Sequence, residues 1–248
     1  MVSLASFSRL SAMAVLWIFP SIASASEPDF VGTLDLLPAG CENTPRCQLG
    51  EEFGFIDSAG LGWQARKGLL TDGASIPPWA QPLVGGSFEK AFIKAAVIHD
   101  HYCDRRVRPW RQTHKVFYEA LLKSNVPKGK AGIMYFAVMV GGPKWAKLIK
   151  GKPCPVGVGC INSTEISASI PGGSITVGET SEIFVSRSDA FGTARFANLM
   201  TKTMPQLEQA GDALTAAEVE TLAARAMSDD FYFKNGDDVG TNLDVDIR

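Results

Sequence analysis

Apolar side chains recur every three or four positions over two stretches in the middle of the chain, which predicts two amphipathic helices. The first spans about residues 88–103 and carries His99 and Cys103 on its apolar face. The second ends near Ser124 and carries His114 on its apolar face. A short loop joins the two helices, and short connections make helices antiparallel neighbours. We therefore expect His114 to face His99.

The regions next to this helical pair show other patterns. Before it, alternating runs at 53–57 and 61–66 flank a Gly-containing turn, which predicts a β-hairpin. After it, a nearly all-apolar helix is expected over 130–140, followed by a short helix around Trp145. Residues 161–190 are rich in Ser, Thr, Gly and Ile, so we expect a linker or a small strand pair there.

The C-terminal part of the chain holds one further helix signal. Thr215 and Glu218 fit a capping box that begins a helix through Met227. Together these elements predict an α+β fold, in which short N-terminal β-hairpins pack on a helical core of three to four helices with a C-terminal appendage. The expected parts are a signal peptide (1–25), a core α+β domain with the histidines (26–153) and an acidic extension with a linker and helices (154–248).

The N-terminus has the pattern of an export signal. Arg9 precedes an apolar stretch over 10–19, and Ala23-Ser24-Ala25 matches the small-x-small cleavage rule. The apolar stretch is shorter than the roughly 20 residues needed to cross a bilayer. We therefore expect cleavage near Ser26, no transmembrane segment in the mature chain, and an exported protein that is periplasmic or secreted.

Export gives the five cysteines a meaning, because disulfides persist in oxidising compartments. Cys41 and Cys47 enclose one short loop, Cys154 and Cys160 enclose another, and each pair is expected to form a local disulfide. Cys103 is left over on the first amphipathic helix. It is interpreted either as a small buried apolar residue or as a free thiol or ligand.

Charge is segregated along the chain, although the net charge is only −2. Residues 88–152 hold 14 basic and 4 acidic residues, whereas residues 27–87 hold 3 and 8, and residues 161–248 hold 6 and 14. Such a basic block attracts an anionic envelope polymer or lipid headgroups. Outside the cytoplasm, nucleic acid is not an expected partner. The alternative is that the acidic flanks dock on the basic centre.

All three histidines, His99, His101 and His114, lie within sixteen positions. Imidazole titrates near neutrality and is the usual side chain for moving protons or holding a metal. Asp100 follows His99 on the same helix, and Asp72 lies in the preceding loop. We expect His99, Asp100 and Asp72 to be catalytic, and His99, Asp100, His114 and Asp72 to be candidate ligands of zinc or calcium. His101 is expected to lie outside the site.

Three motifs in this region are similar to those of a known family. They are Thr71-Asp72-Gly73-Ala74-Ser75-Ile76-Pro77, the pair His99-Asp100, and Phe117-Tyr118-Glu119-Ala120-Leu121. With this order and spacing, over about residues 50–145, the chain resembles an uncharacterised family of bacterial and phage proteins, a domain of unknown function with TDGxSIP, HD and FYEAL motifs. That family usually has Asp where this chain has His114. The resemblance implies no activity.

Two further chemistries fit parts of the same region. The run over 99–103 resembles the helical His-Asp pair of secreted A2 phospholipases, which implies a lipid substrate, although their calcium loop and their disulfides around the helix have no match here. Alternatively, Ser75 is a nucleophile, with His99 as base and Asp72 or Asp100 orienting it. Ser75 lacks the GxSxG context of such nucleophiles and also fits a loop serine that bonds its own backbone.

We therefore predict an exported hydrolase that uses a His/Asp site, with or without a divalent metal, on a cell-envelope component such as peptidoglycan or lipid. The alternative is a noncatalytic envelope or phage-derived interaction module, whose polar cluster is a structural hydrogen-bond network. A hydrolase requires the imidazoles and an acidic group to meet at a solvent-accessible hollow. A structural network requires only that every polar atom is paired.

Overall fold

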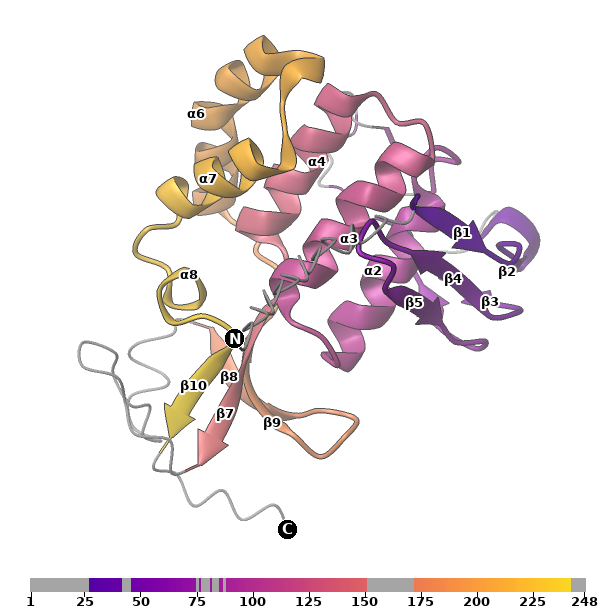
Figure 1. The fold of residues 1–248 in the computed structure, drawn as a ribbon, viewed down its shortest axis with the longest axis horizontal. Helices are drawn as coiled ribbons and strands as arrows, with labels where there is room; N and C mark the ends of the chain where they lie inside the picture. The colour runs from indigo at the N-terminus through magenta and orange to yellow at the C-terminus, as the bar shows by residue number, and fades with distance from the viewer. Residues whose placement is uncertain are drawn as a thin grey trace, which may run out of the picture.

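The computed structural model describes residues 27–41, 46–74, 76, 81, 85–86, 88–150 and 172–241. The expected signal peptide, the Cys154/Cys160 pair and Ser75 lie outside these residues. The chain has an α+β fold, as predicted. Two small antiparallel sheets lie beside a layer of helices, and the later part of the chain adds more helices and a four-stranded sheet (Figure 1).

The N-terminal strands form two small antiparallel sheets, in the orders β1-β4-β5 and β2-β3-β6. The hairpin predicted over 53–66 is confirmed as β4 and β5, with Phe55 opposite Trp63. The predicted Cys41–Cys47 disulfide is also present. The elements are β1 (Asp29–Val31), β2 (Leu36–Leu37), η1 (Ala39–Cys41), β3 (Cys47–Leu49), β4 (Phe53–Ile56), β5 (Gly62–Ala65) and β6 (Leu70–Thr71).

Three consecutive helices form the centre of the molecule: α2 (Ile93–Arg105), α3 (Trp110–Lys123) and α4 (Lys128–Gly141). Their prediction is confirmed, although α2 begins about one turn later than the apolar pattern suggested. Pro109 and Pro127 directly precede α3 and α4. Proline is well tolerated at a helix start, where its missing N–H has no partner to lose. Each proline thus begins a helix directly after a short connection, and neighbouring helices pack against one another.

The helix expected around Trp145 is wrong, because these residues form a strand, β7 (Lys144–Lys150). β7 pairs with β9 in antiparallel fashion and with β10 in parallel fashion, so both of its edges are occupied. Partners far along the chain thus override a local pattern that allows either structure. The other C-terminal elements are β8 (Gly173–Val177), β9 (Ile183–Arg187), α6 (Ala194–Ala210), η2 (Gly211–Ala213), α7 (Ala216–Ala226), α8 (Phe231–Asn235) and β10 (Asp238–Thr241).

Helix α4 is apolar around most of its circumference because it is enclosed. α3 packs on one side of it, and α6 and α7 pack on the other (Figure 1). The approach is close: a Cβ at Gly132 would lie 2.6 Å from the Leu214 side chain, and one at Gly129 would lie 2.9 Å from the backbone of Gly211. The capping box at Thr215 and Glu218 is present and begins α7 as predicted. Among the described residues, no helix is both long and apolar enough to cross a membrane.

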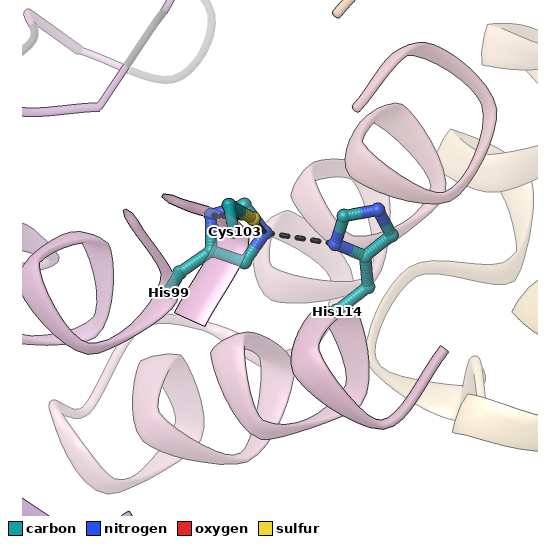
Figure 2. Close-up of side chains that lie close together, drawn as sticks. All are labelled: His99, Cys103 and His114. Atoms are coloured by element: carbon teal, nitrogen blue, oxygen red, sulfur yellow. Dashed lines mark hydrogen bonds between the residues drawn. The ribbon is translucent and has the colours of Figure 1, made fainter. Parts of the chain in front are cut away.

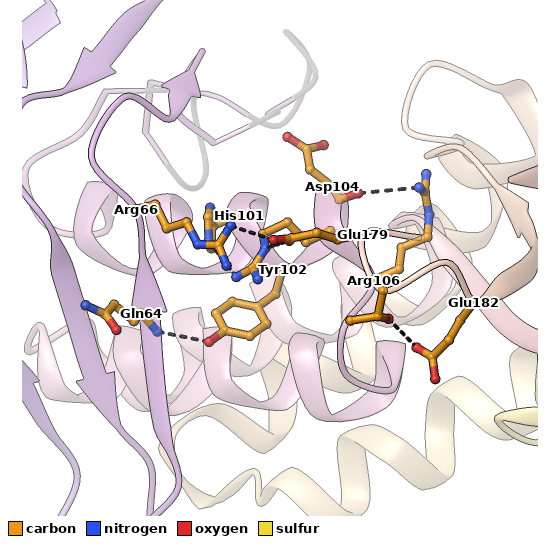
Figure 3. Close-up of polar contacts among 10 residues, drawn as sticks. Gln64, Arg66, His101, Tyr102, Asp104, Arg106, Glu179 and Glu182 are labelled. Atoms are coloured by element: carbon orange, nitrogen blue, oxygen red, sulfur yellow. Dashed lines mark hydrogen bonds and ion pairs between the residues drawn. The ribbon is translucent and has the colours of Figure 1, made fainter. Parts of the chain in front are cut away.

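Part of the basic central block is paired with acidic residues from its flanks. Glu179, between β8 and β9, accepts hydrogen bonds from Arg66 at 2.5 Å and from Arg105 (Figure 3). Arg111 pairs with Asp237 at 3.2 Å. Exposed pairs of this kind contribute little stability individually. They support the alternative that the acidic flanks dock on the basic centre.

Candidate functional site

Two imidazoles and a thiol meet between α2 and α3. His99 Nε2 lies 2.8 Å from His114 Nδ1, and Cys103, one turn after His99, places its Sγ 3.5 Å from His99 Nε2 (Figure 2). One ligand atom from each of the three residues falls within 4.8 Å of the others. The prediction that His114 faces His99 is confirmed. Of the two interpretations of Cys103, burial fits the first and its place beside the imidazoles fits the second.

In each imidazole, the nitrogen that does not face the other ring lies near an oxygen atom. His114 Nε2 lies 3.1 Å from the carbonyl oxygen of Pro143, and His99 Nδ1 lies 3.6 Å from Asp100 Oδ1. The chain passes very close to His114 before Pro143, because a Cβ at Gly142 would lie 3.0 Å from the His114 ring and 2.5 Å from the carbonyl oxygen of Val138. A glycine therefore allows the turn after α4 to bring this carbonyl to the ring.

The structure does not place the two carboxylates together with both imidazoles. Asp100 projects away from His114, and its Oδ2 lies 3.2 Å from Thr71 Oγ1. Asp72 is exposed at the cavity described below. Within the described residues, neither aspartate belongs to the group of close ligand atoms, whose third member is Cys103. The reason is helical geometry, since adjacent residues project about 100° apart whereas residues four apart share a face.

The first family motif positions Asp100. Thr71 Oγ1 donates to Asp100 and accepts a hydrogen bond from the backbone N–H of Gly73 at 3.0 Å. Gly73 has a φ of 78°, a left-handed conformation that favours glycine, as its place in the motif suggested. Burial raises the pKa of Asp100, and the neighbouring Asp72 adds to this, while His99 and Thr71 oppose it.

The third family motif positions His99. The Phe117 ring packs against the His99 ring at a centroid distance of 4.9 Å. Glu119, two residues further on, accepts hydrogen bonds from the backbone N–H and the hydroxyl of Ser58 at 2.8 and 2.9 Å. The motif therefore holds one imidazole from the side and fastens α3 to the turn of the N-terminal hairpin.

A cavity of about 510 Å³ adjoins the cluster. His99, Cys103, Asp100 and Asp72 line one part of it, whereas His114 is fully buried behind them. The remaining wall is mainly apolar and comes mostly from α3, from α4 and from the segment that leads into and through α6, with residues 70–76 and the charged side chains of Arg46, Asp104 and Asp189 at other points. Its apolar residues include Phe117, Ile133, Met134, Ala137, Val138, Phe191, Phe196, Met200 and Met204. An apolar cavity with a few convergent polar groups is the usual form of a small-molecule site.

Burial sets the protonation states in the cluster. It lowers the pKa of His114 well below its usual value, so the imidazole is neutral, which is the form that binds metals. It raises the pKa of the Cys103 thiol well above its usual value, so the thiol keeps its proton unless a cation is bound beside it. The cluster therefore offers a neutral imidazole at His114 and a latent thiolate at Cys103 beside the His99 ring.

His101 lies outside the cluster, as expected. Its Nε2 lies 3.0 Å from a guanidinium nitrogen of Arg105, and burial, with a contribution from Arg105, lowers the pKa of His101 to about 4. The neighbouring Tyr102 accepts a hydrogen bond from the backbone N–H of Gln64 at 3.0 Å (Figure 3). Tyr102 therefore fastens α2 to β5, whereas the His101 contact lies within α2.

Lys144 is a fully buried lysine that no sequence pattern had indicated. Its ammonium donates to the carbonyl oxygens of Val140 and Gly142 at 3.1 Å each. It also lies 5.4 Å from the centre of the Trp110 ring, a distance at which a cation is attracted to the ring. Burial nevertheless lowers the pKa of Lys144 to about 7, and the nearby Arg187 contributes.

Replacing Lys144 by Met should change how stability depends on pH. The pKa of Lys144 falls from 10.5 to about 7 on folding, so between these values the unfolded chain binds more protons. Stability of the natural protein therefore rises with pH through this window, by about 1.4 kcal/mol for each pKa unit of difference. The melting temperature of the Met variant, relative to the natural protein, should thus be highest near pH 6 and fall toward pH 10. A constant difference across this range would contradict the prediction.

The fold and the cluster define a class: an α+β protein with an imidazole–thiol group at the end of an apolar cavity. Residues 47–138, which contain the whole cluster, match the family described as "Protein of unknown function (DUF1353)". The chain belongs to this family. No solved structure matches it.

Two relatives come from Sinorhizobium fredii (strain NBRC 101917 / NGR234). The chain is 40% identical over 181 residues to "Uncharacterized protein y4iH", covering 72% of this chain and 70% of that protein. It is 38% identical over 146 residues to "Uncharacterized protein y4jT", covering 55% of this chain and 44% of that protein. These names describe no activity, so function has to be argued from the side chains.

Proposed function

We propose that the protein is an exported hydrolase that cleaves an acyl ester or amide bond of a cell-envelope lipid, with a divalent metal assisting. The observation that carries this proposal is the position of His99. Its ring lines the cavity, Asp100 lies beside one of its nitrogens, and His114 lies beside the other. An oriented imidazole at a ligand-sized cavity is suited to hold a metal ion, and a metal ion held there would activate water.

The apolar wall favours a lipid over peptidoglycan among envelope substrates. Phe191, Phe196, Met200 and Met204 face the same cavity as His99. An acyl chain would be removed from water along this wall, and its carbonyl carbon would lie at the polar part of the cavity. Water activated there attacks the carbonyl, the bond to the leaving alcohol or amine breaks, and that group takes up the proton. Sugar chains would find few partners on this wall.

Two features support the proposed export. The N-terminal residues have the pattern of a cleaved signal, with Ala23-Ser24-Ala25 at the expected position. The Cys41–Cys47 disulfide is of the kind that persists in oxidising compartments. Together they favour the periplasm or the medium, where envelope lipids are accessible.

A noncatalytic interaction module is the second candidate, and one observation favours it. His114 is completely buried, and both of its ring nitrogens have partners, which are His99 and the carbonyl oxygen of Pro143. In this case the cluster would be a buried hydrogen-bond network that fixes the packing of α2 on α3. The cavity would then bind an apolar group without cleaving it.

Acyl release by the purified full-length chain tests the proposal. Suitable substrates are chromogenic esters of increasing acyl length and phospholipid vesicles, and the His99→Gln variant prepared in parallel serves as the blank. Each added methylene that enters the cavity is worth about 0.8 kcal/mol, so kcat/KM should rise about fourfold per methylene until the cavity is filled. Absence of hydrolysis, or a rate that does not depend on chain length, would overturn the lipid hydrolase and favour the interaction module.

A further inference from the structure

The inner nitrogens of the two imidazoles are placed where one cation could bind both. The carbonyl oxygen of Pro143 can only accept, so His114 Nε2 carries a proton and His114 Nδ1 holds a lone pair in the neutral ring. His99 Nδ1 lies 3.6 Å from the Asp100 carboxylate, and a proton on that nitrogen leaves a lone pair on His99 Nε2 as well. With the proton on Nε2 instead, His99 donates a hydrogen bond to His114 across the 2.8 Å between the inner nitrogens. A metal ion in this place therefore competes with an ordinary hydrogen bond between the rings.

A metal ion fits the surroundings better than a proton. A proton between the rings, shared or in a hydrogen bond, would leave Cys103 without a role in the cluster. A metal ion uses all three side chains, because Cys103 Sγ lies 3.5 Å from the same nitrogen of His99 that faces His114. We propose that His99 Nε2, His114 Nδ1 and Cys103 Sγ bind one zinc ion.

The donor set points to zinc rather than calcium. Calcium takes oxygen ligands, whereas imidazole nitrogen and thiolate sulfur are typical zinc ligands. In a tetrahedral zinc site with these bond lengths, donor atoms lie about 3.3–3.6 Å apart. The distance of 3.5 Å between Cys103 and His99 already fits, and the two imidazoles need to separate by about half an ångström. All three donor atoms lie within 4.8 Å of one another, so the remaining adjustment is about an ångström.

The outer shell also has the form of a zinc site. Ligating histidines usually donate their second N–H to a carboxylate or a backbone carbonyl. Here Asp100 lies at that position for His99, and Pro143 lies there for His114. This assigns the expected aspartate a positioning role in place of direct ligation.

Three protein ligands leave a fourth position for water, as in catalytic zinc sites. His99 and Cys103 both line the cavity, so that position would be on the cavity side. Zinc lowers the pKa of a bound water and so supplies a nucleophile at neutral pH. The inference deepens the proposed function and rests on it only for the catalytic role of the metal, because zinc binding is measured without substrate.

Metal analysis of the full-length chain tests the site. The natural protein should hold about one zinc per chain, and cobalt in its place should give a thiolate-to-cobalt charge-transfer band. Cys103→Ser should remove that band. His99→Ala and His114→Ala should each weaken zinc binding by more than the roughly 10- to 100-fold that changes in the outer shell cost. His101→Ala, on the same helix but outside the cluster, is the matched control and should keep both the zinc and the band.

Zinc-edge X-ray absorption of the natural protein keeps the test decisive even if a variant does not fold. It should find one sulfur at about 2.3 Å and two imidazole nitrogens at about 2.0–2.1 Å. No zinc, no sulfur neighbour, or a charge-transfer band that persists in Cys103→Ser would overturn the site. Zinc in a protein without hydrolytic activity would overturn the proposed function and leave the metal site intact.

Discussion

Replacing His99 by Gln should lower the kcat of acyl hydrolysis by more than about 100-fold, because changes in the outer shell of a metal site alone cost about 10- to 100-fold. His99 is the imidazole that lines the cavity, and both of its nitrogens face groups that orient it. Gln retains a polar side chain of similar length but is a poor zinc ligand. The loss should therefore appear mainly in kcat, while KM, which reflects the apolar wall, should change little. Steady-state kinetics on the best acyl substrate gives both constants.

The matched control is His101→Gln. His101 lies two residues further along α2, is also buried, and contacts Arg105 instead of the cluster. Its replacement should leave kcat within a few-fold of the natural value. Equal losses in both variants would mean that the integrity of α2, and not the imidazole at the cavity, limits the activity. Retention of activity in His99→Gln would remove His99 from the mechanism.

Local spacing was sufficient to predict the centre of this site. His99 and Cys103 are four residues apart and therefore share one helical face. His114 lies near the start of the next helix after a short loop, so it was expected to face His99, and the two ring nitrogens are in hydrogen-bond contact. The capping box at Thr215 is equally local and was equally predictable.

Contacts between distant segments could not be predicted in this way. The carbonyl of Pro143 reaches His114 only because α4 ends beside α3, and a glycine at 142 permits the close approach. Similarly, the strand at Trp145 depends on β9 and β10, whose pairing partners lie far along the chain. A local pattern carries no information on such partners, so both features became visible only in the folded chain.

The C-terminal part has a larger role at the cavity than its composition suggested. Its acidic, polar sequence indicated an appendage, yet Phe191, Phe196, Met200 and Met204 supply part of the apolar wall beside the cluster. These residues lie outside the part of the chain that matches the family model, 47–138. The reactive groups and part of the cavity wall therefore come from different parts of the chain: the segment that matches the family holds the cluster, and the later helix shapes what reaches it.

Replacing Trp110 by Ala should lower the free energy of unfolding by about 3–5 kcal/mol, as is typical for truncating a buried tryptophan. Trp110 is fully buried at the start of α3. Its ring packs at centroid distances of 5.5 Å from His114 and 5.2 Å from Phe233, and it lies under the buried ammonium of Lys144. The alanine variant would leave a cavity beside one member of the cluster and remove the ring that faces a buried charge. Urea unfolding followed by circular dichroism measures the loss.

Trp110→Phe separates ring packing from the indole N–H. Among the described residues no hydrogen-bond partner is found for Trp110 Nε1, and a buried unpaired donor costs about 1–3 kcal/mol. Phenylalanine keeps an aromatic face toward Lys144 but fills less of the space, which lowers stability. It also removes the unpaired donor, which raises stability, so the two effects partly cancel. We expect Trp110→Phe to lose less than half the stability that Trp110→Ala loses. Equal losses in the two variants would show that the indole N–H has a partner, such as bound water, and that this bond rather than the ring stabilises the start of α3.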